Sequence, residues 1–231
     1  MIIICAKVIH SRCYPYGMLK QFSIKDYLLL GLLAFFSYLM IVITAKYIPA
    51  TTTANFLQIK QSYIHIKVWL ICFYVHVYTS MFALVAGFTQ FSQYILKRHK
   101  PLHRAIGYIY VTTVIGISGP ASFVMGIFAN GGLLSRISFC TLAVLWIYFT
   151  TKAFLTAKQK DFKAHERFMI RSYALTLSAI TLRAWKYVLV ALFHPRPMNV
   201  YMIVAWMGWV INIAFAEWLI RRRIEKLKIE S

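Results

Sequence analysis

Residues 199–220 read NVYMIVAWMGWVINIAFAEWLI, and three arginines, Arg221, Arg222 and Arg223, follow them directly. Within this stretch Glu217 is the one charged residue. An α-helix rises about 1.5 Å per residue, so about 20 apolar residues cross the hydrocarbon core of a bilayer. The stretch is therefore expected to form a transmembrane helix. The arginines are expected to mark its cytoplasmic end, where Lys and Arg accumulate.

Further stretches of the chain meet the same criterion of length and hydrophobicity. The expected spans are 27–45, 68–91, 105–129, 137–156, 168–193 and 199–220. The fifth is the most polar of them, because it carries Arg183 and Lys186. These spans predict an all-α fold, a polytopic transmembrane helical bundle with six spanning helices. The first span is too long for the apolar core of a signal peptide, so we expect a retained anchor.

The same boundaries divide the chain into three parts. Residues 1–26 are expected to be a cytoplasmic N-terminal segment, and residues 27–220 a single six-helix membrane domain. Residues 221–231 are expected to be a basic cytoplasmic tail. The third span contains Gly119-Pro120, where the loss of a backbone hydrogen bond predicts a kink.

Composition agrees with lipid as the main solvent of the chain. Hydrophobic residues make up 60% of the sequence and charged residues 14%, whereas a soluble domain is about a quarter charged. The formal net charge is +20. The basic residues lie between apolar stretches and are not clustered as on a nucleic-acid-binding face, so we expect the lipid bilayer as partner and no nucleic acid.

The distribution of Lys and Arg predicts the orientation of the bundle. The connections 97–104 and 157–167 and the C-terminal tail are rich in basic residues, whereas the alternate connections carry few. With both termini in the cytoplasm, every basic connection lies inside. The six acidic residues fall on the same inner side. The expected location is the cell (inner) membrane, with several passes and cytoplasmic ends.

Two polar clusters are expected among the spans, the first in the outer half of the membrane. His76 lies ~13 Å below the outer boundary and Arg183 ~16 Å below it, at a rise of 1.5 Å per residue. A membrane-embedded cation costs at least ~2.5 kcal/mol, and embedded ionisable groups normally pair or line a cavity. No acidic residue lies at that depth. A carbonyl, water, a lipid headgroup, a cofactor carboxylate or a substrate must therefore face Arg183. Asn212 of the sixth span is expected to point inward.

The second cluster is expected at the inner face. It comprises His103, Arg104, His165, Arg167, Arg171 and Glu217. Glu217 is the expected partner of one of these arginines. His103 and His165 come from different helices, and two neutral imidazoles can coordinate haem iron, so both are possible haem ligands.

Several common enzyme motifs are missing from the sequence. His165-Glu166 begins like the zinc-protease motif HExxH, but Met169 stands where its second histidine belongs. The four cysteines form no CxxC pair, and we expect them to be reduced thiols. No pair of carboxylates lies in the spans, which argues against a carboxylate-driven proton pump.

Two blocks of residues are similar to a known family. The first runs from His76 through Gly87 and Gln90 to Pro101-Leu-His103-Arg104 and Tyr110; the second is His165, Arg167 and the run Phe168-Met-Ile-Arg-Ser-Tyr-Ala-Leu-Thr176, followed by Thr181-Leu-Arg183. Together with Asn212 and Glu217 they resemble a bacterial family of predicted membrane proteins, the domain of unknown function DUF2306. Phe168 stands where the family commonly has Trp. The resemblance covers roughly residues 70–220 and implies a membrane fold without implying an activity.

Three functional hypotheses remain open. The leading one is a redox protein that binds haem b or a quinone-like cofactor at its histidines. The second is a transporter, or a protein that binds a lipid or a small anion, at the polar cluster around His76 and Arg183. The third is a structural or partner subunit in which the polar residues specify helix packing. Whether the chain is an enzyme is left open by all three.

Overall fold

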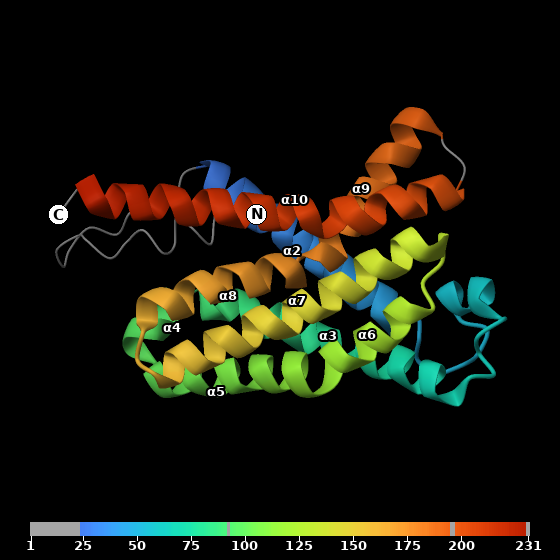
Figure 1. The fold of residues 1–231 in the computed structure, drawn as a ribbon, viewed down its shortest axis with the longest axis horizontal. Helices are drawn as coiled ribbons and strands as arrows, with labels where there is room; N and C mark the ends of the chain where they lie inside the picture. Colours follow the sequence, from blue (N-terminus) through green and yellow to red (C-terminus); the bar gives the residue numbers. More distant parts are fainter. Residues whose placement is uncertain (1–23, 92, 195–196, 230–231) are drawn as a thin grey trace.

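The computed structural model of the protein describes residues 24–91, 93–194 and 197–229. Every regular element in these ranges is a helix, and most of the helices run along the long axis of an elongated bundle (Figure 1). The elements are α2 (Ile24–Ala45), the 3₁₀-helix η2 (Asn55–Lys60), α3 (Lys67–Gln90), α4 (Gln93–Arg98), α5 (Lys100–Val111), the π-helix η3 (Thr112–Ser118), α6 (Gly119–Ile127), α7 (Gly132–Lys158), α8 (Phe162–Thr176), α9 (Ser178–Phe193) and α10 (Pro197–Ile229).

Four of the helices are long and apolar enough to cross a membrane. They are Lys67–Gly87, the continuous α5–η3–α6 stretch Lys100–Ile127, Gly132–Lys158 and Met198–Glu225. The bent pair α8 and α9 raises the number to five if it counts as one span. The expected span 27–45 lies within α2, whose shorter apolar part is Ala34–Ala45. The all-helical fold with several membrane-crossing helices is thus confirmed, with four to five candidate spans in the described residues.

The expected fifth span, 168–193, is not one continuous helix. The chain breaks at Leu177, and α8 and α9 meet there at a bend of 42°. The Ala174 carbonyl at this break accepts a hydrogen bond from Asn212 Nδ2 at 3.0 Å. A polar side chain from another helix thus supplies a donor where the backbone ladder is interrupted, and such compensation is needed in a membrane interior.

The expected N-terminal segment and tail have different outcomes. Most of the segment 1–26 lies outside the described residues. In the expected tail, residues 221–229 continue α10 as a helix, and the cytoplasmic location of the tail stays a prediction. The expected kink at Pro120 is preceded by the π-helix η3, which ends at Ser118. The wider turns of a π-helix accommodate the local disruption without ending the helix.

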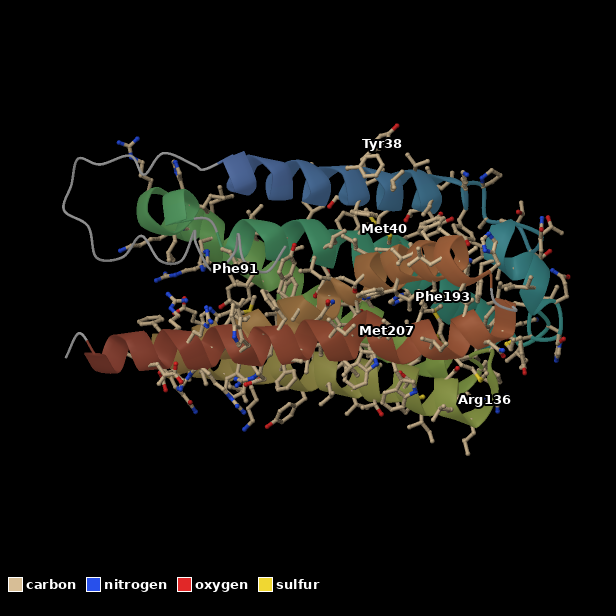
Figure 2. All side chains as sticks on the ribbon, turned by 90° about the horizontal axis from the view of Figure 1, so that it is seen from above. Tyr38, Met40, Phe91, Arg136, Phe193 and Met207 are labelled. Carbon is tan, nitrogen blue, oxygen red and sulfur yellow. The ribbon has the colours of Figure 1, made fainter. Side chains whose placement is uncertain are left out.

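The buried core lies between α3, α5, α7, α8 and α10, and α7 and α8 form an antiparallel pair. At Gly87, α3 lies close to its neighbours, since an added Cβ would lie 2.5 Å from ring carbons of Tyr173. Helices α2 and α3 pack side by side as well. On α2, Met40 points toward the bundle and Tyr38 points away from it (Figure 2).

We call residues 46–66, together with the aromatic residues that they cover, the outer cap. Tyr47, Leu57, Trp69 and Phe73 form its buried centre. The Lys60 ammonium is buried in it and donates a hydrogen bond to the Phe128 carbonyl at the end of α6. In Figure 1 the cap occupies one end of the bundle, and the α7–α8 turn and the end of α10 lie at the other.

Candidate functional site

The inner cluster comprises His103, His165, Arg171 and Glu217, and it lies toward the end of the bundle with the α7–α8 turn. Helix α5 begins at Lys100 with Pro101 in its first turn, a favourable position because that amide has no helical partner. Helix α8 begins after Asp161, whose carboxylate accepts a hydrogen bond from the Ala164 amide at 3.0 Å. These two starts fix His103 and His165 in the opening turns of their helices.

The expected ion pair of Glu217 with an inner arginine is confirmed, and the arginine is Arg171. Its Nε and Nη2 atoms donate to the two carboxylate oxygens at 2.5 and 2.9 Å. The guanidinium also lies 5.5 Å from the centre of the Phe168 ring. A two-pronged pair of this kind is strong and directional. It ties α8 to α10, and the carboxylate of Glu217 neutralises the charge of Arg171.

The two inner histidines are close enough to interact electrostatically. His165 Nδ1 lies 2.8 Å from the Ala153 carbonyl of α7. Because a carbonyl only accepts, His165 Nδ1 must carry the proton, and its Nε2 has the lone pair when the ring is neutral. The Nδ1 atom of His103 is buried and has no hydrogen-bond partner in the described structure. Arg104 is exposed and lies within electrostatic reach of His103.

The outer cluster comprises His76, Ser118 and Arg183. His76 Nδ1 lies 3.1 Å from the Ser118 carbonyl and 3.0 Å from its hydroxyl. Arg183 is close enough to interact electrostatically with His76, and its Nη1 donates to the Ala179 carbonyl of its own helix at 2.6 Å. The structure thus brings these three residues together.

Asn212 lies in neither cluster. Its Nδ2 atom donates to the Ala174 carbonyl and to the Thr181 hydroxyl, both at 3.0 Å. The Thr181 hydroxyl in turn bonds the Gly208 carbonyl at 2.5 Å. These contacts join the α8–α9 break to α10, so the role that the structure supports for Asn212 is to stabilise the break.

A polar network between the two clusters was not recognised in the sequence. The Tyr110 hydroxyl lies 2.7 Å from Ser172 Oγ and 2.8 Å from Thr176 Oγ1. Trp146 donates to Thr176 Oγ1 at 2.9 Å, and Thr150 lies 2.7 Å from Ser172. Small polar residues such as Ser172 and Thr176 are common at contacts between membrane helices, and only their partners on α5 and α7 reveal a buried network. Its hydroxyls already have partners within the protein, so it has a structural role.

Larger metal sites are not found in the described part of the chain. No group of three or more His, Cys, Asp or Glu side chains there could hold a metal ion. Both described cysteines, Cys72 and Cys140, are free thiols. Among the described residues, the histidine pair of the inner cluster could therefore hold a metal ion, provided that the metal needs only two protein ligands.

These features define an all-helical membrane protein with several candidate spans and two polar clusters. The chain belongs to the family described as predicted membrane protein DUF2306, whose model matches residues 73–220. The resemblance seen in the sequence is thereby confirmed. The matched region contains both clusters and the broken α8–α9 helix pair. No curated protein and no solved structure matches the chain.

Proposed function

We propose that the protein is a membrane redox protein that holds haem b between α5 and α8, with His103 and His165 as the two iron ligands. The observation that carries the proposal is the state of the ring nitrogens. His165 Nδ1 is fixed by the Ala153 carbonyl, which leaves Nε2 as the free nitrogen. Metal-bound histidines commonly have this second hydrogen bond, because it fixes the tautomer and the orientation of the ring.

His103 supports the same assignment. A buried polar atom without a partner costs about 1–3 kcal/mol, and native proteins keep such atoms where a ligand or function requires them. The unpartnered Nδ1 of His103 lies on a ring within electrostatic reach of His165. The neutral imidazoles of His103 and His165 would hold the haem iron, and bound haem would supply one-electron transfer.

Basic residues near the histidine pair could bind the carboxylates of haem b. Arg104 is exposed near His103, whereas Arg171 is already paired with Glu217. We therefore assign Arg104, and not Arg171, to the haem carboxylates. A guanidinium can bind a carboxylate through two parallel hydrogen bonds.

An absorption spectrum of the purified full chain, expressed with ample haem precursor, tests this proposal. The expected result is a Soret band and, after reduction, the sharp visible bands of low-spin iron with two imidazole ligands. His103→Ala and His165→Ala should each abolish the low-spin spectrum, and added imidazole should restore it. His65→Ala is the matched control, since His65 is exposed in the outer cap. A wild-type protein without a Soret band would overturn the assignment.

A quinone is the second redox cofactor that the histidine pair could serve. Imidazole and guanidinium groups can donate hydrogen bonds to the carbonyl oxygens of a quinone. Mass spectrometry of a lipid extract from the same preparation distinguishes the two cases. If the wild type contains a quinone and no haem, and His165→Ala removes the quinone, the proposed cofactor becomes a quinone. The absence of both would favour a structural subunit.

We further propose six spans in the inner membrane with both termini in the cytoplasm. The proposal counts α2, with 22 residues, as the first span and the bent pair α8–α9 as the fifth. In support, the beginning of α2, the α7–α8 turn and the end of α10 lie toward one end of the bundle (Figures 1 and 2). The basic connections lie toward this end too, as the positive-inside rule requires of cytoplasmic loops.

A further inference from the structure

Arg183 is a cation in the bundle that has no acidic partner within the described part of the chain. The acidic residues of the whole chain are Asp26, Asp161, Glu166, Glu217, Glu225 and Glu230. Glu217 is paired with Arg171, and Glu166 with Arg223. Asp161 caps α8, Asp26 belongs to the beginning of α2 and Glu225 to the end of α10, whereas Glu230 lies outside the described residues. The five described acidic residues lie toward the end opposite the outer cap, so none of them can neutralise Arg183.

The position of Arg183 makes this lack of an anion costly. It lies 11 residues before His194 at the end of α9, or ~16 Å at 1.5 Å per residue. The side chain is partly buried. A cation this deep costs at least ~2.5 kcal/mol unless it is paired or hydrated. A counter-anion from outside the chain would remove much of this cost.

The Arg183 guanidinium also has more N–H donors than it uses in hydrogen bonds to the described residues. It carries five N–H groups, and the Ala179 carbonyl accepts a bond from Nη1. The groups within electrostatic reach are His76, Tyr47 and Tyr187. None of these three side chains is a carboxylate that could form an ion pair with the cation. Most of the guanidinium is therefore available to an external acceptor.

The backbone around Arg183 is interrupted in two helices. In the continuous helix α5–η3–α6, the π-helix η3 ends at Ser118, whose carbonyl and hydroxyl lie within hydrogen-bond distance of His76 Nδ1. In the bent pair α8–α9, the helix is interrupted at Leu177, six residues before Arg183. π-Helical turns are frequent at functional sites, and membrane proteins place substrate sites at such discontinuous helices. Here both interruptions lie beside one unneutralised cation.

We propose that the outer cluster is a second ligand site, separate from the inner histidine pair, that binds an oxyanion group through Arg183. The group is a carboxylate or phosphate, because the planar guanidinium offers paired N–H donors to two oxygens. His76 is fixed through Nδ1 by Ser118, which leaves its Nε2 as a further polar contact. The oxyanion belongs either to a lipid headgroup or to a small soluble molecule.

The test uses the full chain in nanodiscs of phosphatidylcholine and measures thermal unfolding with three probes. The probes are inorganic phosphate, octanoate and phosphatidylglycerol mixed into the nanodisc. At least one probe should raise the unfolding temperature of the wild type with a saturable dose response. Stabilisation by phosphate or octanoate identifies a soluble anion, and stabilisation by phosphatidylglycerol alone identifies a lipid headgroup.

Arg183→Gln should weaken the effective probe at least tenfold. Lys186→Gln is the matched control, since it removes an exposed cation from the same helix one turn away, and its response should stay within twofold of the wild type. Equal responses of wild type and Arg183→Gln would overturn the proposal. If Arg183→Gln does not fold, the wild type alone tests the proposal. A wild type that responds to none of the three probes would also overturn the proposal.

Discussion

At the scale of single residues, Arg171 and Glu217 form the best-defined polar contact of the inner end. Both side chains are partly exposed, with 19% and 36% of their surface accessible, so solvent screening reduces the value of the pair. Removing one partner nevertheless leaves an unpaired charge between packed helices, and that cost usually exceeds the value of the pair itself.

Glu217→Leu alone and Arg171→Met alone should therefore each destabilise the protein more than the double variant Arg171→Met with Glu217→Leu. We expect a coupling of about 1–2 kcal/mol, between the values for exposed and buried pairs. A double-mutant cycle on thermal unfolding in detergent measures it. A coupling near zero would show that Arg171 is stabilised by Phe168 stacking alone.

Tyr110 is the hydroxyl on which the buried network converges. Its side chain has 0% exposure, and the hydroxyl lies within 2.8 Å of both Ser172 Oγ and Thr176 Oγ1. Tyr110→Phe leaves these hydroxyls short of a partner and should cost about 1–3 kcal/mol. Tyr108→Phe is the control, because Tyr108 is 57% exposed. Equal unfolding temperatures of the two variants would contradict a stabilising role for the network.

At the scale of helices, α3 lies close to its neighbours at Gly87. A Cβ there would lie 2.5 Å from two ring carbons of Tyr173 and 2.9 Å from Tyr110. Gly87→Ala should therefore separate the helices and cost about 1–3 kcal/mol through overpacking. At Gly116 a Cβ meets nothing within 4 Å. Gly116→Ala should be neutral or stabilising, and a stabilised Gly87→Ala would show that α3 can shift freely.

The outer cap contains Lys60, whose charged form is disfavoured by burial. Burial, with a smaller contribution from the charge of Arg136, lowers the pKa of Lys60 from 10.5 to about 8. Tyr63, whose ring centre is 4.9 Å from the ammonium, compensates in part. Between these two pKa values the docked cap binds fewer protons than the undocked cap, so its docking becomes more favourable as the pH rises through this window.

The cap should thus dock more firmly at pH 9.5 than at pH 7. Hydrogen exchange of residues 46–66, corrected for the pH dependence of intrinsic exchange, measures this docking. Lys60→Met should remove the pH dependence, and Lys67→Met, at an exposed position, should retain it. A cap with the same protection at both pH values in the wild type would contradict the argument.

Sequence reasoning located elements by their apolar length, and this worked where a helix is continuous. The expected span 68–91 nearly coincides with α3 (Lys67–Gln90). At 168–193 it did not predict the break at Leu177, where Asn212 from a distant part of the chain donates a hydrogen bond to the Ala174 carbonyl. Charge and depth likewise selected His76 and Arg183 as neighbours. The hydrogen bonds of His76 to Ser118 and of His165 to Ala153 required knowledge of how the helices pack.

At the scale of the whole molecule, the proposed topology places residues 129–131 outside and residues 159–161 inside the cell. Single cysteines at Asn130 and Gln159, in a background without the native cysteines, distinguish the two sides. In intact cells a membrane-impermeant maleimide should label the cysteine at 130 and label the one at 159 only after permeabilisation. The reverse pattern would invert the orientation, and labelling of both would contradict an odd number of crossings between them.

Helix α10 has 33 residues, which corresponds to ~50 Å at 1.5 Å per residue. The hydrocarbon core of a bilayer is only about 30 Å thick. The helix therefore continues past the hydrocarbon core, and residues 221–229 extend it by about two and a half turns, or ~13 Å, through the headgroup region. This projection is a rigid spacer. A fluorescent protein fused after Ser231 should stand at a nearly constant height above the membrane, and energy transfer to a lipid dye would report that height as a narrow distribution.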